Sequence, residues 1–136
     1  MASRVRKPRG VLIVGGKRYR VRLIYDPYDR VWVAKLTRSQ LRSILLRFGD
    51  RVFIRRVLVY DPNYDGVVHV DGGWRRLSRD GLAWVLEHSL KYADDIEYSP
   101  MHGYISVHEG GGGVYHVKLA DVEIELVATE TGQQRP

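Results

Sequence analysis

Two nearly identical segments constrain the fold of this chain more than any other feature of its sequence. Residues 23–27 read LIYDP, and residues 58–62 read LVYDP. Proline fits the second position of a type I turn because its φ angle is preset, and the aspartate before it can hydrogen-bond back to the backbone. β-Branched and aromatic residues flank both segments. Each segment therefore predicts a β-hairpin with an Asp-Pro turn.

A capped helix is expected after each hairpin. The stretch LTRSQLRSIL (36–45) aligns with LSRDGLAWVL (77–86), and Thr37 and Ser78 are the expected N-caps because a side-chain oxygen there satisfies a free backbone N–H. Apolar residues recur at helical spacing in both copies: Leu41, Ile44, Leu45 and Phe48, and Leu82, Val85, Leu86 and Leu90. We interpret the two stretches as duplicated ββα units, the second of which is longer by an insertion at Asn63 and within residues 71–76.

The C-terminal third is predicted to form antiparallel β-strands. Residues 103–108 and 114–127 alternate apolar and polar side chains, and GGGG (110–113) between them is typical of a hairpin tip. The alternation slips at Ala120–Asp121, where we expect a β-bulge. The predicted fold is a single α+β domain of 136 residues. It divides into a basic arm (1–10), a first ββα unit (11–56), a second ββα unit (57–95), a C-terminal β-hairpin region (96–128) and a tail (129–136).

The distribution of charge points to a polyanionic partner. Residues 1–56 contain sixteen Lys or Arg and three acids, a net charge of +13, whereas residues 57–136 contain six against thirteen, a net charge of −7. Such asymmetry favours nucleic acid or a charged self-contact as partner, unless the two halves interleave in space and their charges pair.

Alternation along the first unit predicts a cationic surface. In KRYRVRLIY (17–25), three arginines fall on one strand face and the apolar residues on the other. Arginine offers paired donors to phosphate oxygens, and each neutralised phosphate releases counterions. No base-reading motif is present, so we expect contacts to the backbone of DNA or RNA. The candidate nucleic-acid-binding residues are Arg4, Arg6, Lys7, Arg9, Lys17, Arg18, Arg20, Arg22, Arg38 and Arg42.

Residues 29–54 contain a strand, a short helix, a Gly-Asp turn and a strand of the form x-Val-x-Ile. Gly49 suits the left-handed position that ends a helix, and Asp50 can close the turn. This stretch resembles the AbrB/MazE type of DNA-binding domain, through Leu41, Leu45, Gly49, Asp50, Val52 and Ile54. The resemblance implies a swapped-hairpin, barrel-like fold, which a duplicated ββα chain can form, and binding to DNA.

Histidines in the second half raise the question of chemistry. His102, Tyr104, Ser106 and His108 are expected on one strand face, with His116 and Lys118 across the hairpin. Two histidines and a lysine are what a metal-independent nuclease needs, and three histidines can hold zinc. Histidines without such a role are far commoner on exposed strands, so we assign no catalytic, metal-binding or cofactor-binding residue. Asp26, Asp29, Asp61 and Asp65 are explained as turn residues.

Composition narrows the class of protein further. There is no cysteine, and no apolar run approaches the roughly 20 residues that span a bilayer. We therefore expect an intracellular, cytoplasmic protein with no membrane partner. Scarce Asn and Gln and the absence of cysteine fit a hyperthermophilic archaeon or its virus or plasmid, whereas the excess of Arg over Lys can also reflect GC-rich DNA. The first hypothesis is an oligomeric nucleic-acid-binding protein; the alternatives are an assembly protein that pairs its basic and acidic halves, and a nuclease.

Overall fold

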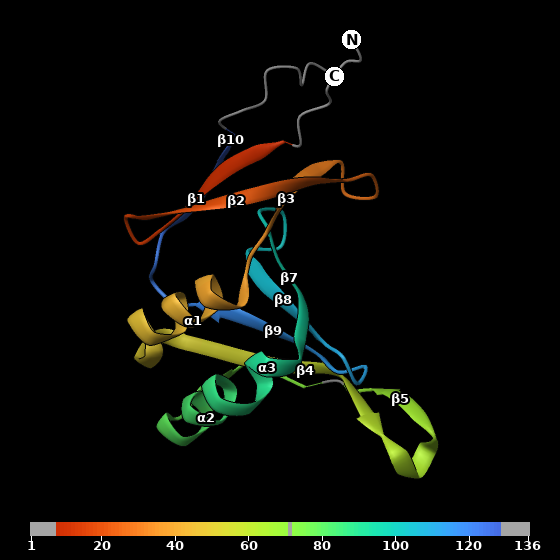
Figure 1. Ribbon diagram of the computed structural model, residues 1–136. Helices are drawn as coiled ribbons and strands as arrows, with labels where there is room; N and C mark the ends of the chain where they lie inside the picture. Colours follow the sequence, from red (N-terminus) through yellow and green to blue (C-terminus); the bar gives the residue numbers. More distant parts are fainter. Residues whose placement is uncertain (1–7, 71, 129–136) are drawn as a thin grey trace.

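The computed structural model describes residues 8–70 and 72–128 as an α+β structure dominated by antiparallel strands (Figure 1). The α+β class is thus confirmed. The strands are β1 (Arg9–Val14), β2 (Lys17–Asp26), β3 (Val31–Lys35), β4 (Val52–Asp61), β5 (Gly66–His69), β6 (Arg75–Arg76), β7 (Ala93–Ser99), β8 (Tyr104–Glu109), β9 (Val114–Leu119) and β10 (Ile124–Ala128). The helical segments are α1 (Arg38–Arg47), the 3₁₀ turns η1 (Gly49–Arg51) and η2 (Pro62–Tyr64), α2 (Arg79–Trp84), the π-helical segment η3 (Val85–Ser89) and α3 (Leu90–Tyr92).

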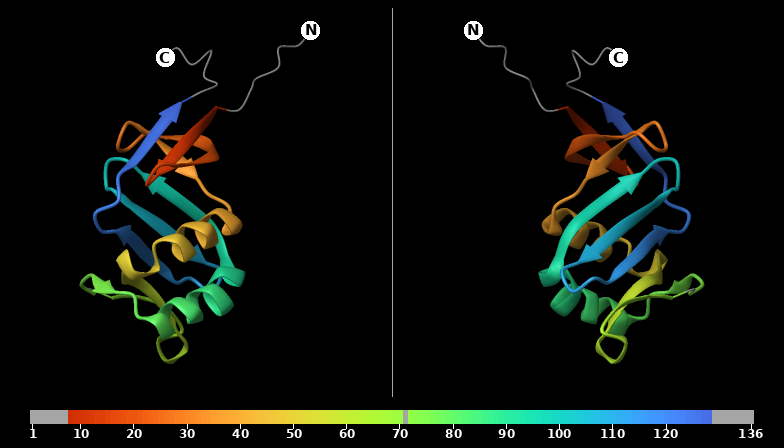
Figure 2. Two further views of the ribbon diagram at one scale, coloured as in Figure 1. Left: turned by 90° about the vertical axis from the view of Figure 1, so that its left-hand side faces the viewer. Right: turned by 90° about the vertical axis from the view of Figure 1, so that its right-hand side faces the viewer.

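The strands form one sheet in the order β10-β1-β2-β3-β7-β8-β9-β4-β5, with β6 paired to β4. Strands β3 and β7 join its two halves through only two residue pairs, Ala34 with Tyr98 and Lys35 with Glu97. Figures 1 and 2 show the sheet bending at this junction, with α1 inside the bend and α2 and α3 beside β4. The sheet does not close into a barrel. None of the helices in the described ranges has both the length and the apolar character that a bilayer span requires.

Both predicted Asp-Pro hairpins are present and have the same turn geometry. Asp26 and Asp61 each accept a hydrogen bond from the backbone N–H two residues later, at 2.9 Å. Each loop ends in a residue with a left-handed φ of 56°, Arg30 in the first and Asp65 in the second. The surroundings differ, because β2 and β3 lie within the sheet whereas β4 and β5 lie at its end. The structure therefore confirms two similar hairpins, but it does not confirm duplicated ββα units.

The predicted helix caps are confirmed. The Thr37 hydroxyl accepts from the backbone of Gln40, whose side chain accepts from the backbone of Thr37 in return, which makes a capping box. The Ser78 hydroxyl accepts from the backbone of Gly81. The second helix contains a π-helical segment, where the backbone N–H of Leu90 bonds to Val85, a feature that the apolar spacing did not predict.

The prediction that Gly49 has a left-handed φ angle is wrong. Helix α1 ends at Arg47, its C-cap residue Phe48 has a φ of −120°, and Gly49 begins η1 without a left-handed φ. Space explains the glycine instead: a Cβ atom there would lie 2.9 Å from Leu82 Cδ2. A larger residue would require the Leu82 side chain to move.

The prediction of a continuous strand with a bulge over residues 114–127 is also wrong. The chain turns between β9 and β10, and Asp121 has a left-handed φ of 56°. β10 then pairs with β1 at the far end of the sheet order. The slip in alternation therefore marks a turn that sends the chain to another partner strand.

The sheet has an inner face that packs against the helices and an opposite outer face. Tyr19, Val21 and Leu23 of β2 are buried on the inner face. The predicted apolar faces of both helices join the same core, where Leu41, Ile44 and Leu45 are fully buried. Because strand side chains alternate and directly paired residues share a side, the pairing register identifies the residues of the outer face.

Candidate nucleic-acid interface

Four of the predicted arginines lie together on the outer face. Arg18, Arg20 and Arg22 alternate with the buried residues of β2, and Arg9 of β1 pairs directly with Arg22. All four side chains are exposed. Among the described residues, none of the four has a carboxylate within 4.0 Å. These four residues are called the arginine group below.

Three other predicted residues lie on the helix side of the sheet. The Arg38 and Arg42 guanidinium groups donate to the backbone carbonyls of Ala93 and Leu86, at 2.7 and 3.1 Å. Lys17 Nζ donates to the Ser43 hydroxyl at 3.3 Å. The structure therefore does not bring the candidate residues into one strip. The remaining three, Arg4, Arg6 and Lys7, lie outside the described residues.

A row of directly paired side chains connects the arginine group with the other half of the outer face. Seven neighbouring strands, from β1 to β4 in the sheet order, contribute one residue each, and each residue is the register partner of the next. The row, called the polar row below, contains Arg9, Arg22, Lys35, Glu97, Ser106, His116 and Arg55.

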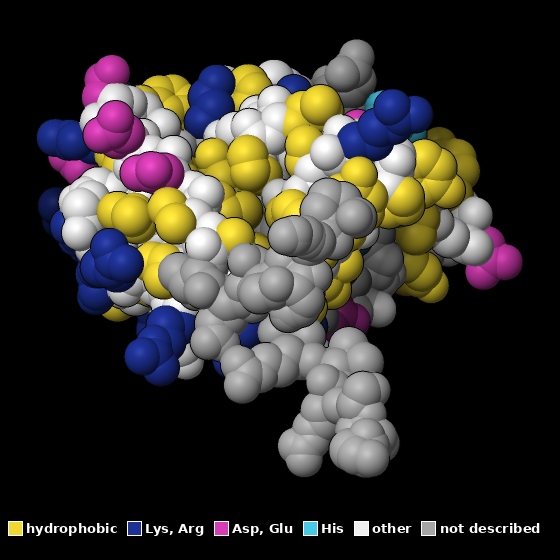
Figure 3. Space-filling model, turned by 90° about the horizontal axis from the view of Figure 1, so that it is seen from above, with side chains coloured by type: hydrophobic (Ala, Val, Ile, Leu, Met, Phe, Trp, Pro, Cys, Tyr) yellow, Lys and Arg dark blue, Asp and Glu magenta, His cyan; other side chains and the backbone are white. Residues whose placement is uncertain are grey.

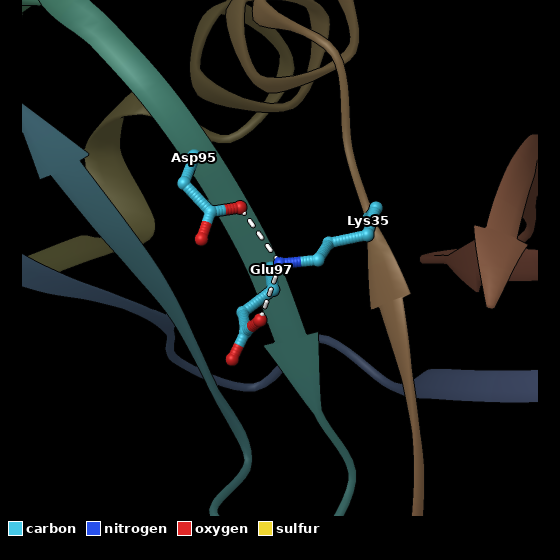
Figure 4. Close-up of polar contacts among 3 residues, drawn as sticks. All are labelled: Lys35, Asp95 and Glu97. Carbon is cyan, nitrogen blue, oxygen red and sulfur yellow. Dashed lines mark hydrogen bonds and ion pairs between the residues drawn. The ribbon is translucent and has the colours of Figure 1, made fainter. Parts of the chain in front are cut away.

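The middle of the polar row holds an internal ion-pair group of one lysine and two carboxylates, with a net charge of −1 (Figure 4). Lys35 Nζ lies 2.7 Å from Asp95 Oδ1 and 2.8 Å from Glu97 Oε2. Burial alone would lower the pKa of Lys35, but the hydrogen bonds and charges of the two carboxylates outweigh it and raise that pKa. Lys35 therefore stays charged and is not available to a partner, and the free cations lie on either side of it.

An aromatic cluster lies at the far end of the polar row. The rings of Tyr104 and His116 stack with centroids 4.0 Å apart, and His102 stacks on the other side of Tyr104 at 5.3 Å. Trp74 lies 6.0 Å from Tyr104. These four residues, Trp74, His102, Tyr104 and His116, are called the aromatic cluster below.

Two cations lie against the aromatic cluster. The Arg55 guanidinium is 4.6 Å from the centroid of Trp74, and Lys118 Nζ is 4.7 Å from it. The sequence predicted the shared face of Tyr104, His116 and Lys118, but not the presence of Trp74 or Arg55. The sequence does contain a signal for Arg55. Arg55 and Arg56 are adjacent in a strand, so their side chains must point to opposite faces of the sheet, and one of them must lie on the outer face.

His116 is held in its neutral form. Its Nδ1 atom accepts a hydrogen bond from Arg55 Nε at 3.1 Å. Burial first, and then the charge of Arg55, lower its pKa from 6.5 to about 4. A histidine with this pKa is a weak general base at neutral pH and cannot act as a general acid there. The arrangement therefore favours a stacking role for the His116 ring and not a catalytic role in a nuclease.

We predict that the His116 imidazole titrates with a midpoint near pH 4. Its folded-state pKa lies below the unfolded value of 6.5, so its contribution to stability is present above pH 6.5 and is lost as the pH falls toward 4. Histidine NMR signals followed from pH 8 to 3.5 test this, with His116→Gln to assign the signal. Arg55→Ala should raise the midpoint, and a wild-type midpoint near 6.5 would contradict the geometry.

The positive charge on the outer face is not continuous. Figure 3 looks down on the part of the sheet that contains β1 and β2. In the area not covered by grey atoms it shows Lys and Arg side chains spaced around hydrophobic ones, and a group of Asp and Glu side chains on the left. Ile13 and Ile24 belong to the outer face, and Ile24 is 41 % exposed. The outer face thus combines separate cations with apolar surface.

The sequence raised two metal-site arrangements, and the structure forms neither within residues 8–70 and 72–128. No three His, Asp or Glu side chains gather there in a geometry that would hold a metal ion. The two Asp-Pro turns lie at opposite ends of the molecule (Figures 1 and 2). Asp29 instead lies 3.1 Å from His102 Nε2.

A polar network that sequence reasoning missed lies on the inner face. Arg56 donates to Glu109 Oε1 at 3.1 Å, and the Ser89 hydroxyl donates to Glu109 Oε2 at 2.8 Å. Because that hydroxyl proton is used, Tyr115 Oη donates to Ser89 Oγ, at 2.7 Å. Burial is the main cause that raises the pKa of Tyr115 to about 12.

Comparison with known proteins gives no family to which this chain can be assigned. No protein-family model, no curated protein and no solved structure matched it.

Proposed function

We propose that this protein binds single-stranded nucleic acid on the outer face of its sheet. In this proposal the arginine group contacts phosphates and the aromatic cluster stacks on bases. Proteins that bind single strands without reading their sequence combine these two elements, a positively charged track and aromatic rings.

The arginine group supports the backbone contact. Its four guanidinium groups are exposed and have no carboxylate partner among the described residues. Each can donate two parallel hydrogen bonds to a phosphate. Two acids of the outer face, Asp95 and Glu97, pair with Lys35 instead. A third, Glu125, shares a register row with Arg18 through Ile13 but is not within 4.0 Å of it.

The aromatic cluster supports the base contact. The rings of His102, Tyr104 and His116 are stacked and Trp74 is tilted against them, with Arg55 and Lys118 beside Trp74. A base stacked on such a ring contributes roughly 1–3 kcal/mol to binding.

The single observation that carries the proposal is the polar row. It shows that the arginine group, from β1 and β2, lies on the same face of one sheet as Tyr104 of β8 and His116 of β9 in the aromatic cluster. A flexible single strand can follow the bend between the two halves, whereas a straight duplex cannot do so without deformation.

The test is a binding assay with single-stranded DNA, single-stranded RNA and duplex DNA over a range of salt. We expect single strands to bind more tightly than duplex and the affinity to fall steeply with salt. Arg18→Ala/Arg20→Ala/Arg22→Ala should reduce the slope of log K against log salt by about 2, since each neutralised phosphate contributes about 0.7 for single strands.

The matched control is Arg51→Ala/Arg79→Ala/Lys91→Ala, which removes three exposed cations from other parts of the surface. It changes the net charge equally and should leave most of the slope intact. Equal slopes in the two triple variants, or no salt-dependent binding by the wild type, would overturn the proposal.

Several finer predictions remain part of this proposal. The resemblance of residues 29–54 to AbrB/MazE-type domains would favour duplex DNA, so tighter duplex binding would support that family instead. A duplicated ββα unit, a cytoplasmic location and a homo-oligomeric state are also proposals. Sedimentation of the protein without nucleic acid, at low and high salt, tests the last of them.

A further inference from the structure

A pocket of about 400 Å³ lies on the inner face, away from the polar row, between the second helix, β4 and the β8–β9 turn. Three aromatic side chains line it, Tyr60, Trp84 and Tyr92, and they are 51, 46 and 62 % exposed. Trp84, His88 and Tyr92 lie four residues apart along the helix and therefore share one side of it. Pockets of this size are typical of small-molecule sites.

The floor of the pocket is polar and ordered. Arg56 and Glu109 both line the pocket and pair with each other, and their side chains are 37 and 15 % exposed. Ser89 holds the second carboxylate oxygen. A carboxylate accepts about four hydrogen bonds, so Glu109 retains acceptor capacity beside the donors of Arg56.

Glycines form the rim next to this floor. Gly111 and Gly113 line the pocket, and a Cβ at residue 113 would lie 2.6 Å from Glu109 Oε1. Gly112 has a φ of 102°, and a Cβ there would lie 2.6 Å from Val67 Cγ2. The glycines thus bring bare backbone close to the carboxylate and to β5 without filling the pocket. The turn is also fixed to the helix, because the backbone N–H of Gly110 donates to the Tyr92 carbonyl.

We propose that this pocket binds a nucleobase that carries an exocyclic amino group, with guanine preferred. Aromatic walls accept a flat heterocycle by stacking. Guanine offers two adjacent N–H donors, which suit Glu109, and a neighbouring carbonyl oxygen, which suits Arg56. Thymine and uracil lack the amino group and leave one carboxylate acceptor unmatched. The base can come from a free nucleotide or from an unstacked position in a strand.

The test is a titration of the wild-type protein with guanosine, inosine and thymidine monophosphates, measured by calorimetry and by quenching of tryptophan fluorescence. Guanosine monophosphate should bind roughly tenfold more tightly than inosine monophosphate, which lacks the amino group. Trp84→Ala should weaken guanosine binding by about tenfold through lost stacking. Glu109→Gln, which preserves side-chain size, should bring the guanosine-to-inosine ratio close to one.

The control variant is Trp32→Ala, because Trp32 is a similarly exposed tryptophan, 39 %, outside the pocket. It should bind guanosine monophosphate as the wild type does. Comparing a guanine-containing oligonucleotide with a guanine-free one then shows whether the base in the pocket comes from a strand or from a free nucleotide. Equal affinity for all three nucleotides, or an undiminished affinity in Trp84→Ala, would overturn the inference. The salt dependence of single-strand binding, measured with the arginine triple variant, tests only the outer face. Its outcome does not affect the nucleotide titration, which tests the pocket.

Discussion

Replacing Leu45 with alanine should lower the free energy of unfolding by about 2–5 kcal/mol. Leu45 is fully buried in α1 and belongs to the main core, between the two halves of the bent sheet. Truncation removes buried apolar surface and leaves a cavity, because the surrounding side chains relax only in part.

Leu46 provides the control for this prediction, since it is the next residue and is 59 % exposed. Leu46→Ala should change stability by less than about 0.5 kcal/mol. Urea denaturation followed by circular dichroism measures both variants. Similar midpoints for the two would show that α1 does not pack inside the bend as described.

Replacing Arg56 with alanine should destabilise the fold by about 2–3 kcal/mol, because Glu109 would remain largely buried without its cation. The effect is set below the roughly 3–5 kcal/mol of a fully buried pair because the Arg56 side chain is 37 % exposed. The loss of its contacts with Trp84 and Tyr115 adds to the effect.

The neighbouring Arg55→Ala variant has the same change in charge on the opposite face. It should cost less than about 1 kcal/mol in stability but weaken binding of a guanine-free single strand, whereas Arg56→Ala should leave binding of that strand unchanged when the folded fraction is matched. Urea denaturation and the single-strand assay together separate the two arginines. Reversed effects would mean that the outer face has been assigned wrongly.

The parts of the fold that depend on neighbouring residues could be predicted from the sequence. The Asp26 and Asp61 turns and the Thr37 and Ser78 caps are formed by hydrogen bonds between residues two or three positions apart. Alternation likewise placed the β2 arginines on one face, because that regularity belongs to the strand itself.

The features that depend on distant pairing could not be predicted. The alternation alone predicts a bulge at Asp121, where the structure has a turn. The local sequence does not reveal this turn because β10 pairs with β1, more than a hundred residues earlier. Gly49 was assigned to a backbone conformation, although its reason is the distance to Leu82. Arg38 and Arg42 were grouped with the strand arginines by charge, but their backbone-carbonyl partners place them on the helix side of the sheet.

The candidate site also combines features that neighbouring residues determine with features that depend on distant pairing. The shared face of Tyr104 and His116 follows from alternation and a short hairpin. Its continuity with Arg9 and Arg22 requires the β3–β7 pairing, which no local pattern specifies. The Arg56–Glu109 pair, 53 residues apart in sequence, similarly gave no sequence signal.

Photocrosslinking tests the proposed interface most directly. A single-stranded oligonucleotide with 5-iodouracil in place of some bases is bound, irradiated and digested, and the modified residues are identified by mass spectrometry. We predict cross-links at Trp74 and Tyr104, and their loss in the Arg18/Arg20/Arg22 triple alanine variant at moderate salt. Cross-links confined to the helix side of the sheet, or a bound strand that leaves Trp74 and Tyr104 unmodified, would contradict it.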